Sequence, residues 1–86
     1  WPGYDLKIGS SGAKVRQLQE QLTAISKAYP AIPSVRADGI YGLQTEASVE
    51  AFQSIFDLPV TGVVDFSTWY KISQIYVGVT RIAELV

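Results

Sequence analysis

The chain has 86 residues, of which 48% are hydrophobic and 17% charged, and its formal net charge at pH 7 is −1. This composition is typical of one small globular domain and provides no basic face for nucleic acid or an anionic membrane. The absence of cysteine and histidine excludes disulfides, the usual zinc ligand sets and Ser-His-Asp catalysis. We therefore expect no metal and no cofactor. We also expect no membrane span, because no apolar run approaches the roughly 18 residues that a span needs.

Residues 1–5 are expected to be a lead-in, followed by a first helix whose N-cap is Ser10 or Ser11. Hydrophobic residues then recur three or four positions apart, which places them on one side of an α-helix. They are Val15, Leu18, Leu22 and Ile25. The helix should end near Ala28, because the next residue precedes a proline and is therefore disfavoured in helical geometry.

A loop with two prolines leads to the segment Asp38-Gly39-Ile40-Tyr41-Gly42. Two glycines three positions apart around two large apolar residues predict a tight turn that buries Ile40 and brings the backbone close to another group. A second helix should follow this turn and end around position 57. Its apolar face is expected to contain Ala47, Val49, Phe52 and Phe56.

The next segment repeats this turn and helix start at an offset of 23 residues. Both copies contain a glycine, two apolar residues, a helix cap and a threonine as the third helical residue, where its hydroxyl can bond back to the turn. The matched pairs are Gly39 with Gly62, Gly42 with Asp65, and Thr45 with Thr68. The third helix is expected to stop at Gly78, so that residues 6–78 form the domain and residues 79–86 a tail or the start of a linker.

A second echo links the first two helices, each of which has an apolar pair followed by a glutamine. The two copies are Val15-x-x-Leu18-Gln19 and Val49-x-x-Phe52-Gln53. The glutamine amide at the edge of the core can satisfy backbone groups of a loop. Alternatively, glutamine occurs at these positions only because it favours helices.

Taken together, these motifs resemble the small peptidoglycan-binding domain family, an accessory module of bacterial cell-wall hydrolases. The resemblance extends from Leu6 to about Ile75. It is carried by Leu6-x-x-Gly9-x-x-Gly12-x-x-Val15-x-x-Leu18-Gln19-x-x-Leu22, Asp38-Gly39-Ile40-Tyr41-Gly42-x-x-Thr45-x-x-x-Val49-x-x-Phe52-Gln53 and Leu58-x-x-x-Gly62-Val63-Val64-Asp65-x-x-Thr68-Trp69. It implies an all-α fold, a small three-helix bundle with steeply crossing helices and glycine turns before the second and third helices.

The resemblance also implies a non-catalytic module that attaches a larger protein to peptidoglycan, through either the glycan strand or the stem peptide. Such a module is covalently linked to a catalytic or other domain, is a monomer and works extracellularly in the cell wall. The chain departs from the family pattern in a longer loop at residues 23–37 and in Tyr41, where phenylalanine is frequent. Its start has no signal-peptide layout, so any export signal is expected to lie outside this piece.

The first glycine turn is the stronger binding candidate. A helix start at Gly42 leaves N–H groups free and presents the positive end of the helix dipole, which favours a carboxylate or acetamido group of the ligand. Tyr41 would supply a stacking face and Gln44 an amide. In the second turn the charge of Asp65 would repel a carboxylate, so this copy is expected to be structural. The expected ligand-binding residues are Asp38, Gly39, Tyr41, Gly42, Leu43, Gln44 and Thr45.

Several aromatic and polar residues also have a purely structural interpretation. Tyr41 can be a core aromatic residue, Asp38 a turn residue that bonds its own backbone, and Thr45 a structural residue. Trp69 is expected to be buried, whereas Trp1 and Tyr4 are expected to be exposed in the lead-in.

The sequence leaves one alternative to wall binding open and disfavours another. A helical protein-interaction or regulatory domain of the same fold fits the sequence as an alternative. Catalysis is disfavoured, because glycan hydrolysis needs two carboxylates, and the spacing of Glu46 and Glu50 is equally that of two solvated surface charges.

Overall fold

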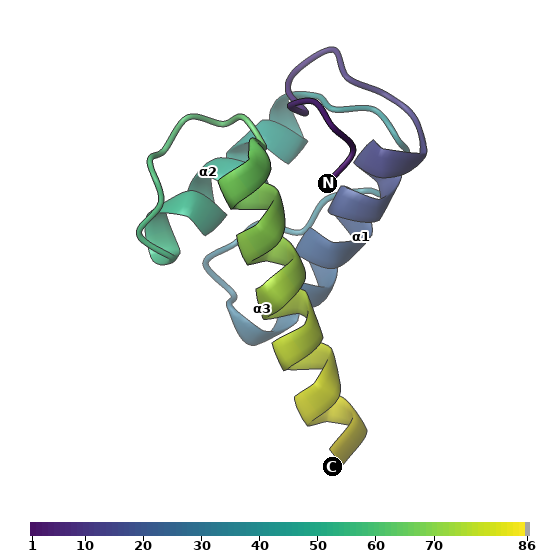
Figure 1. The fold of residues 1–86 in the computed structure, drawn as a ribbon. Coiled ribbons are helices and arrows are strands. Elements are labelled where there is room, and N and C mark those ends of the chain that lie inside the picture. Colours follow the sequence, from purple (N-terminus) through teal and green to yellow (C-terminus); the bar gives the residue numbers. More distant parts are fainter. Residues whose placement is uncertain (86) are drawn as a thin grey trace.

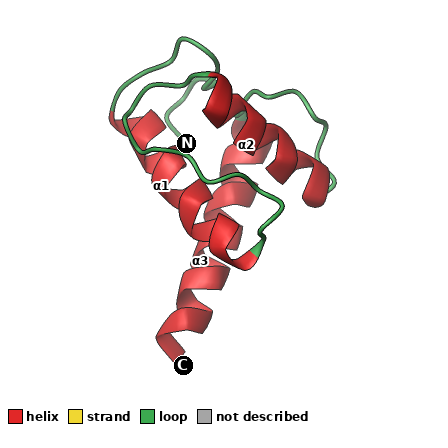
Figure 2. Ribbon diagram, turned by 180° about the vertical axis from the view of Figure 1, so that it is seen from behind, coloured by secondary structure: helices red, strands yellow, loops and turns green. Residues whose placement is uncertain are grey.

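The computed structural model describes residues 1–85, with side chains described through Arg81, and its regular elements in that range are three α-helices. Helix α1 spans Ala13–Ala28, α2 spans Leu43–Ile55 and α3 spans Phe66–Leu85. Helix α1 packs mainly against α3, and α2 runs obliquely to α3 (Figure 1; Figure 2 shows the same arrangement from behind). The prediction of an all-α three-helix bundle is confirmed.

The predicted cap of α1 is wrong. Neither serine caps the helix. The N-cap is Gly12, which has a φ of 113° that side-chain-bearing residues rarely adopt. The Ser10 hydroxyl instead accepts a hydrogen bond from the Lys7 N–H at 3.0 Å and closes the preceding turn. The predicted end of the helix at Ala28 is confirmed.

The sequence predicted that the third helix stops at Gly78, and this prediction is wrong: α3 continues to Leu85. A C-terminal glycine cap needs a positive φ, and Gly78 is not among the glycines with that conformation. The helix continues because the next residue, Val79, packs against the core, and the Thr80 hydroxyl donates to the Tyr76 carbonyl one turn earlier at 2.8 Å. Most of the segment expected as a tail is therefore helical, and Val86 lies outside the described residues.

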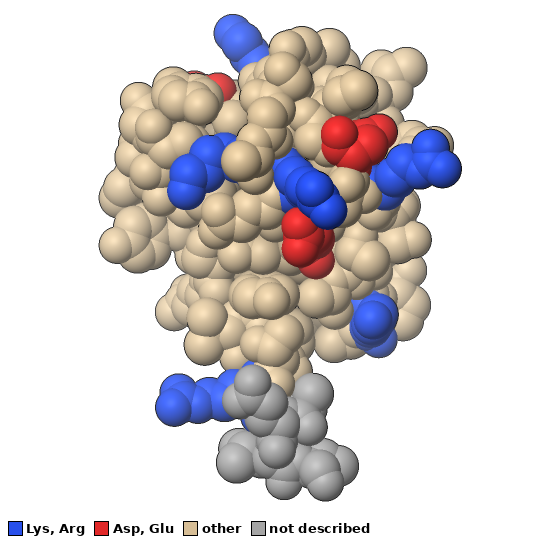
Figure 3. Space-filling view, turned by 90° about the vertical axis from the view of Figure 1, so that its right-hand side faces the viewer, with Lys and Arg blue, Asp and Glu red and all other residues tan. Residues whose placement is uncertain are grey.

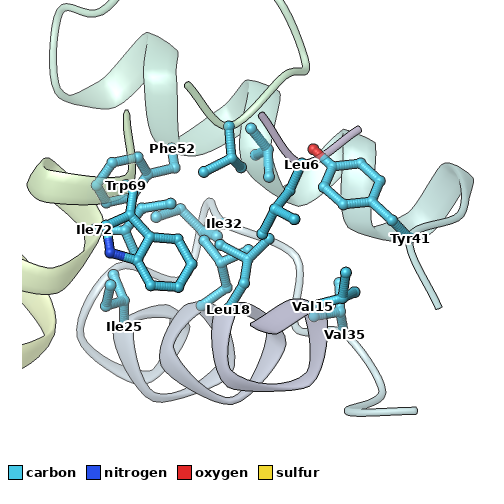
Figure 4. Packing of buried hydrophobic residues seen from close by; sticks show 13 residues of the cluster. Leu6, Val15, Leu18, Ile25, Ile32, Val35, Tyr41, Phe52, Trp69 and Ile72 are labelled. Carbon is cyan, nitrogen blue, oxygen red and sulfur yellow. The ribbon is translucent and has the colours of Figure 1, made fainter. Parts of the chain in front are cut away.

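The hydrophobic core receives side chains from all three helices and from the segments that precede them (Figure 4). Leu6 enters the core from the segment before α1, residues 1–12, which is called the lead-in from here on and is longer than the expected residues 1–5. Ile32 and Val35 enter the core from the loop between α1 and α2. Trp69 is only 5% exposed, which confirms its predicted burial. The long loop is thus part of the packed structure and holds the start of α2 in place.

The first glycine turn is oriented opposite to the prediction. Ile40 is 62% exposed, whereas Tyr41 is 1% exposed. The cause is a short antiparallel bridge between Ser11 and Ile40, because successive side chains of extended backbone point to opposite sides. Tyr41 donates its hydroxyl proton to the Gly62 carbonyl at 2.6 Å, and burial raises the pKa of its phenol well above the ordinary value.

The lead-in connects the two glycine turns through backbone hydrogen bonds. Leu6 and Val64 exchange two such bonds at 3.0 and 2.8 Å, which joins the lead-in to the second turn. Toward the first turn, the Gly12 N–H donates to the Gly39 carbonyl and the Tyr41 N–H donates to the Ser10 carbonyl, both at 2.9 Å. One segment therefore fixes both turns relative to each other.

Charged side chains are sparse on the surface. Figure 3 shows Lys and Arg side chains scattered over one face with acidic groups between them. One helical ion pair joins Arg16 and Glu20 at 3.4 Å, and both side chains are mostly exposed. Within the described part of the chain, no helix combines the length and apolar character needed to cross a bilayer.

Candidate functional site

A buried glutamine holds the first glycine turn against the start of α2. Gln19 is 1% exposed, and its Oε1 accepts a hydrogen bond from the Gly39 N–H at 2.8 Å. Its Nε2 donates toward the Ile40 carbonyl at 2.9 Å, the Thr45 hydroxyl at 3.0 Å and the Asp38 carboxylate at 3.1 Å. The amide thus satisfies loop backbone groups, and the interpretation of this residue as only a helix former is wrong.

A second glutamine repeats this arrangement at the second turn. Gln53 is also 1% exposed, and its Oε1 accepts from the N–H groups of Thr61 and Gly62, both at 3.0 Å. Its Nε2 donates toward the Val63 carbonyl at 3.0 Å and the Thr68 hydroxyl at 3.2 Å. In both copies the threonine hydroxyl accepts from the glutamine, which links the threonine to the turn. The sequence repeat is therefore a repeat of two glutamine-centred hydrogen-bond networks.

The two copies differ at the helix cap. The Asp65 carboxylate accepts a hydrogen bond from the Thr68 N–H at 2.9 Å and caps α3. At the same place before α2 stands Gly42, and within residues 1–85 no side chain makes a capping bond there. The first-turn N–H groups of α2 thus have no side-chain cap, whereas the protein itself satisfies the Thr68 N–H in the first turn of α3.

The open start of α2 borders a pocket of about 250 Å³. Its lining residues are Gln19, Val35, Arg36, Asp38, Ile40, Gly42, Leu43, Gln44 and Thr45. Two large apolar side chains stand exposed at it, Ile40 at 62% and Leu43 at 76%. The pocket therefore combines a glutamine hydrogen-bond network, an uncapped helix start, an exposed apolar rim, one acidic side chain and one basic side chain.

Asp38 and Arg36 give the pocket one carboxylate and one guanidinium. The Asp38 carboxylate accepts hydrogen bonds from the Ile40 N–H at 3.0 Å and from Gln19, and these bonds, with the Arg36 charge as a smaller cause, lower the pKa of Asp38 below its ordinary value. The structural interpretation of Asp38 as a residue that bonds its own turn is confirmed. Arg36 has no ion pair in the described part of the chain, so its charge is available at the pocket.

The structure separates the predicted site residues into two groups. Asp38, Gly42, Leu43, Gln44 and Thr45 line the pocket together. Within this group Thr45 is 2% exposed, and its hydroxyl accepts a hydrogen bond from Gln19. Its interpretation as a structural residue is therefore confirmed.

The other two predicted residues do not line the pocket. Gly39 is buried, donates its N–H to Gln19 and has a φ of 77° that residues with a side chain rarely adopt. Tyr41 faces the core, so the prediction that it supplies a stacking face is wrong, and its hydroxyl is not at a binding surface. The aromatic contribution expected at this place is missing from the pocket.

Four residues that line the pocket were not predicted as site residues: Gln19, Val35, Arg36 and Ile40. Arg36 stands two positions before Asp38, and its proximity to the turn was the available signal. The exposure of Ile40 depends on the pairing with the lead-in, which no local pattern indicates. Within the described residues no three acidic side chains lie close enough together to hold a metal ion.

Comparisons with known proteins place this architecture in a family. Residues 11–72 match a family described as "Putative peptidoglycan binding domain". The chain is 40% identical over 76 residues to the zinc D-Ala-D-Ala carboxypeptidase of Streptomyces albus G, a match that covers 87% of this chain but 28% of that enzyme. The chain thus spans little more than a quarter of this curated relative.

A solved structure has the same fold. The crystal structure of the SleB N-terminal domain superposes with a TM-score of 0.75 and 26% identity, over 88% of this chain and 97% of that one. The matched domain is therefore similar in extent to the present chain. Given the family match over most of its length, this chain belongs to the peptidoglycan-binding domain family.

Proposed function

We propose that the chain is a non-catalytic, monomeric module that attaches a larger secreted protein, a cell-wall hydrolase, to bacterial peptidoglycan outside the cell. Family membership supports the binding role. The match to only 28% of a carboxypeptidase supports a modular arrangement, in which the rest of such an enzyme performs the chemistry. Asp38, the acidic residue that lines the pocket, is engaged in structural hydrogen bonds.

The pocket at the start of α2 is the proposed binding site, and the observation that carries this assignment is its uncapped helix start. The equivalent position before α3 is capped by a carboxylate, Asp65. Within residues 1–85 no side-chain cap occurs at Gly42, so a ligand carboxylate or acetamido oxygen can take the place that Asp65 Oδ1 takes in the other copy.

The other pocket residues suit a stem peptide. The Arg36 guanidinium and the helix start both favour a terminal carboxylate, and the Gln44 amide can donate to or accept from peptide groups. Ile40 and Leu43 offer apolar surface for the aliphatic parts of the peptide. Tyr41 has no part in this contact, because its ring is buried.

Replacing Gly42 tests this site without damaging the fold. Gly42→Asp copies the cap of α3 into α2, and a Cβ at this position meets no atom within 4 Å. The backbone there is extended, with φ −111° and ψ −164°, so the side chain introduces no strain. The variant should be at least as stable as the parent. Its binding to purified insoluble peptidoglycan should fall at least about fivefold, because the new carboxylate occupies the site and repels an anionic ligand.

Gly42→Asn is the matched control, since asparagine caps a helix about as well as aspartate but carries no charge. It should weaken binding less than Gly42→Asp. Retention should be measured by sedimentation with peptidoglycan and, in parallel, with an unrelated insoluble polysaccharide. No enrichment of the parent chain on peptidoglycan contradicts the proposed function. Full binding by a folded Gly42→Asp variant contradicts the site while leaving the function in place.

A further inference from the structure

Three aromatic rings form an exposed cluster at the start of α3, hereafter the aromatic platform: Trp1, Phe66 and Tyr70. Their exposed fractions are 40%, 54% and 62%, respectively. The Trp1 and Phe66 ring centroids are 5.7 Å apart with an edge-to-face arrangement, and those of Phe66 and Tyr70 are 4.9 Å apart. The rings therefore support one another while part of each remains in contact with solvent.

The platform is on the solvent side of α3. Phe66 and Tyr70 are four residues apart and so lie one above the other on the helix, whereas Trp69 and Ile72 on the other side are buried in the core. The core therefore does not explain why these two positions are aromatic. Exposed apolar patches of this kind commonly mark binding surfaces.

Two shallow hollows border the platform and add neutral polar groups. One, of about 120 Å³, is lined by Trp1, Trp69, Tyr70 and Ser73. The other, of about 360 Å³, is lined by Tyr70, Ser73, Gln74 and Val77. No charged side chain lines either hollow; the Lys14 ammonium lies 6.0 Å from the Trp69 ring centroid but lines neither.

The size of the platform distinguishes between a protein partner and a small ring-shaped ligand. At the observed exposures the three rings offer about 300 Å² together, given roughly 150–250 Å² for one fully exposed aromatic side chain. A stable protein–protein interface needs about 800 Å² from each partner. The platform is therefore too small for a second copy of the chain, but it matches one or two sugar rings.

We propose that the aromatic platform is a second binding surface, which stacks on the apolar faces of N-acetylated pyranose rings of the glycan strand. The charge of the lining supports this ligand, because hydroxyl and acetamido groups are neutral and find partners in the Ser73 hydroxyl and the Gln74 amide. This inference rests on the proposed wall-binding function. It assigns glycan recognition to α3 and leaves stem-peptide recognition to the pocket at α2.

Titration with an uncharged N-acetylglucosamine oligomer tests the platform separately from the pocket. Backbone NMR shifts of the labelled chain should change around Trp1, Phe66 and Tyr70, and tryptophan fluorescence should change in parallel. Tyr70→Ala should weaken oligomer binding about tenfold, because one stacked ring is lost. Tyr70→Phe keeps the ring and should bind within about twofold of the parent.

Val60→Ala is the control for loss of exposed apolar surface elsewhere, since Val60 is 55% exposed in the loop between α2 and α3, and it should leave oligomer binding unchanged. Circular dichroism should show that all variants are folded. Shifts confined to the pocket at α2, or equal binding by Tyr70→Ala, would overturn the proposal. So would concentration-dependent dimerisation of the parent in sedimentation experiments that Tyr70→Ala abolishes.

Failure of the platform and failure of the proposed function give different results. Retention on whole peptidoglycan without any oligomer binding contradicts the platform and leaves the wall-binding function intact. Oligomer binding without retention on whole peptidoglycan supports the platform and contradicts the proposed function.

Discussion

The Tyr41 side chain connects the two glycine turns from inside the core. Its ring is 1% exposed, and its hydroxyl donates to the Gly62 carbonyl of the second turn at 2.6 Å. Gly62 is itself buried, so this carbonyl has little access to water. A residue that sequence reasoning placed on a binding surface is therefore a structural link, and its effect should appear in stability rather than in affinity.

Tyr41→Phe tests this assignment. The substitution keeps the ring but leaves a buried carbonyl without its donor, which should lower the free energy of unfolding by about 1–2 kcal/mol. The melting temperature should fall by several degrees, at about 4–8 °C per kcal/mol for a domain of this size. Peptidoglycan retention at a temperature where both proteins are folded should not change. A loss of retention with unchanged stability would restore Tyr41 to the binding surface.

At the scale of the helices, hydrophobic spacing predicted α1 and α2, because it reports on the one face that each helix buries, and the 23-residue repeat of the turn and helix start predicted α3. The end of α1 at Ala28 followed from a local rule, the proline two positions later. The orientation of Ile40 did not, since it depends on pairing with Ser11, which is distant in sequence. Local patterns predict elements, whereas pairing between distant segments decides which side chains reach the surface.

The candidate site was predictable to a similar extent. The duplicated turn indicated where two helices start, and comparing Gly42 with Asp65 identified the start that lacks a cap. The contribution of Arg36 required the path of the loop between α1 and α2, which no periodicity describes. The aromatic platform required the contact of Trp1 with α3, again between distant segments.

Helix α3 provides the prediction at this scale, because it passes through a glycine that the sequence suggested as its end. Gly78 has helical neighbours on both sides, and a Cβ there meets no atom within 4 Å. Gly78→Ala should therefore stabilise the chain by about 0.5–1 kcal/mol, measured by urea unfolding.

Gly62→Ala is the contrasting variant. Gly62 has a φ of 72°, and an added Cβ would lie 2.9 Å from the Glu46 Cγ, so this substitution should destabilise the chain. No gain in stability from Gly78→Ala would mean that α3 ends near Gly78 in solution. That result would return the following residues to the tail that the sequence predicted.

On the scale of the whole molecule, the lead-in acts as part of the core. Its backbone pairs with both glycine turns, and the Leu6 side chain is 1% exposed among residues from all three helices (Figure 4). The glutamine networks of Gln19 and Gln53 each hold one turn, but the lead-in joins the two turns to each other. Unfolding of one turn should therefore unfold the other.

Leu6→Ala tests this coupling. The substitution should lower the free energy of unfolding by about 2–4 kcal/mol, because it leaves a cavity between the two turns. Tyr4→Ala is the control from the same segment, since Tyr4 is 57% exposed and should change stability by less than about 0.5 kcal/mol. Far-UV circular dichroism and tryptophan fluorescence should give coincident urea transitions in all three proteins. A Leu6→Ala variant that loses only part of its helix signal at low urea would show that the turns unfold independently, and the lead-in would then be an accessory to the bundle.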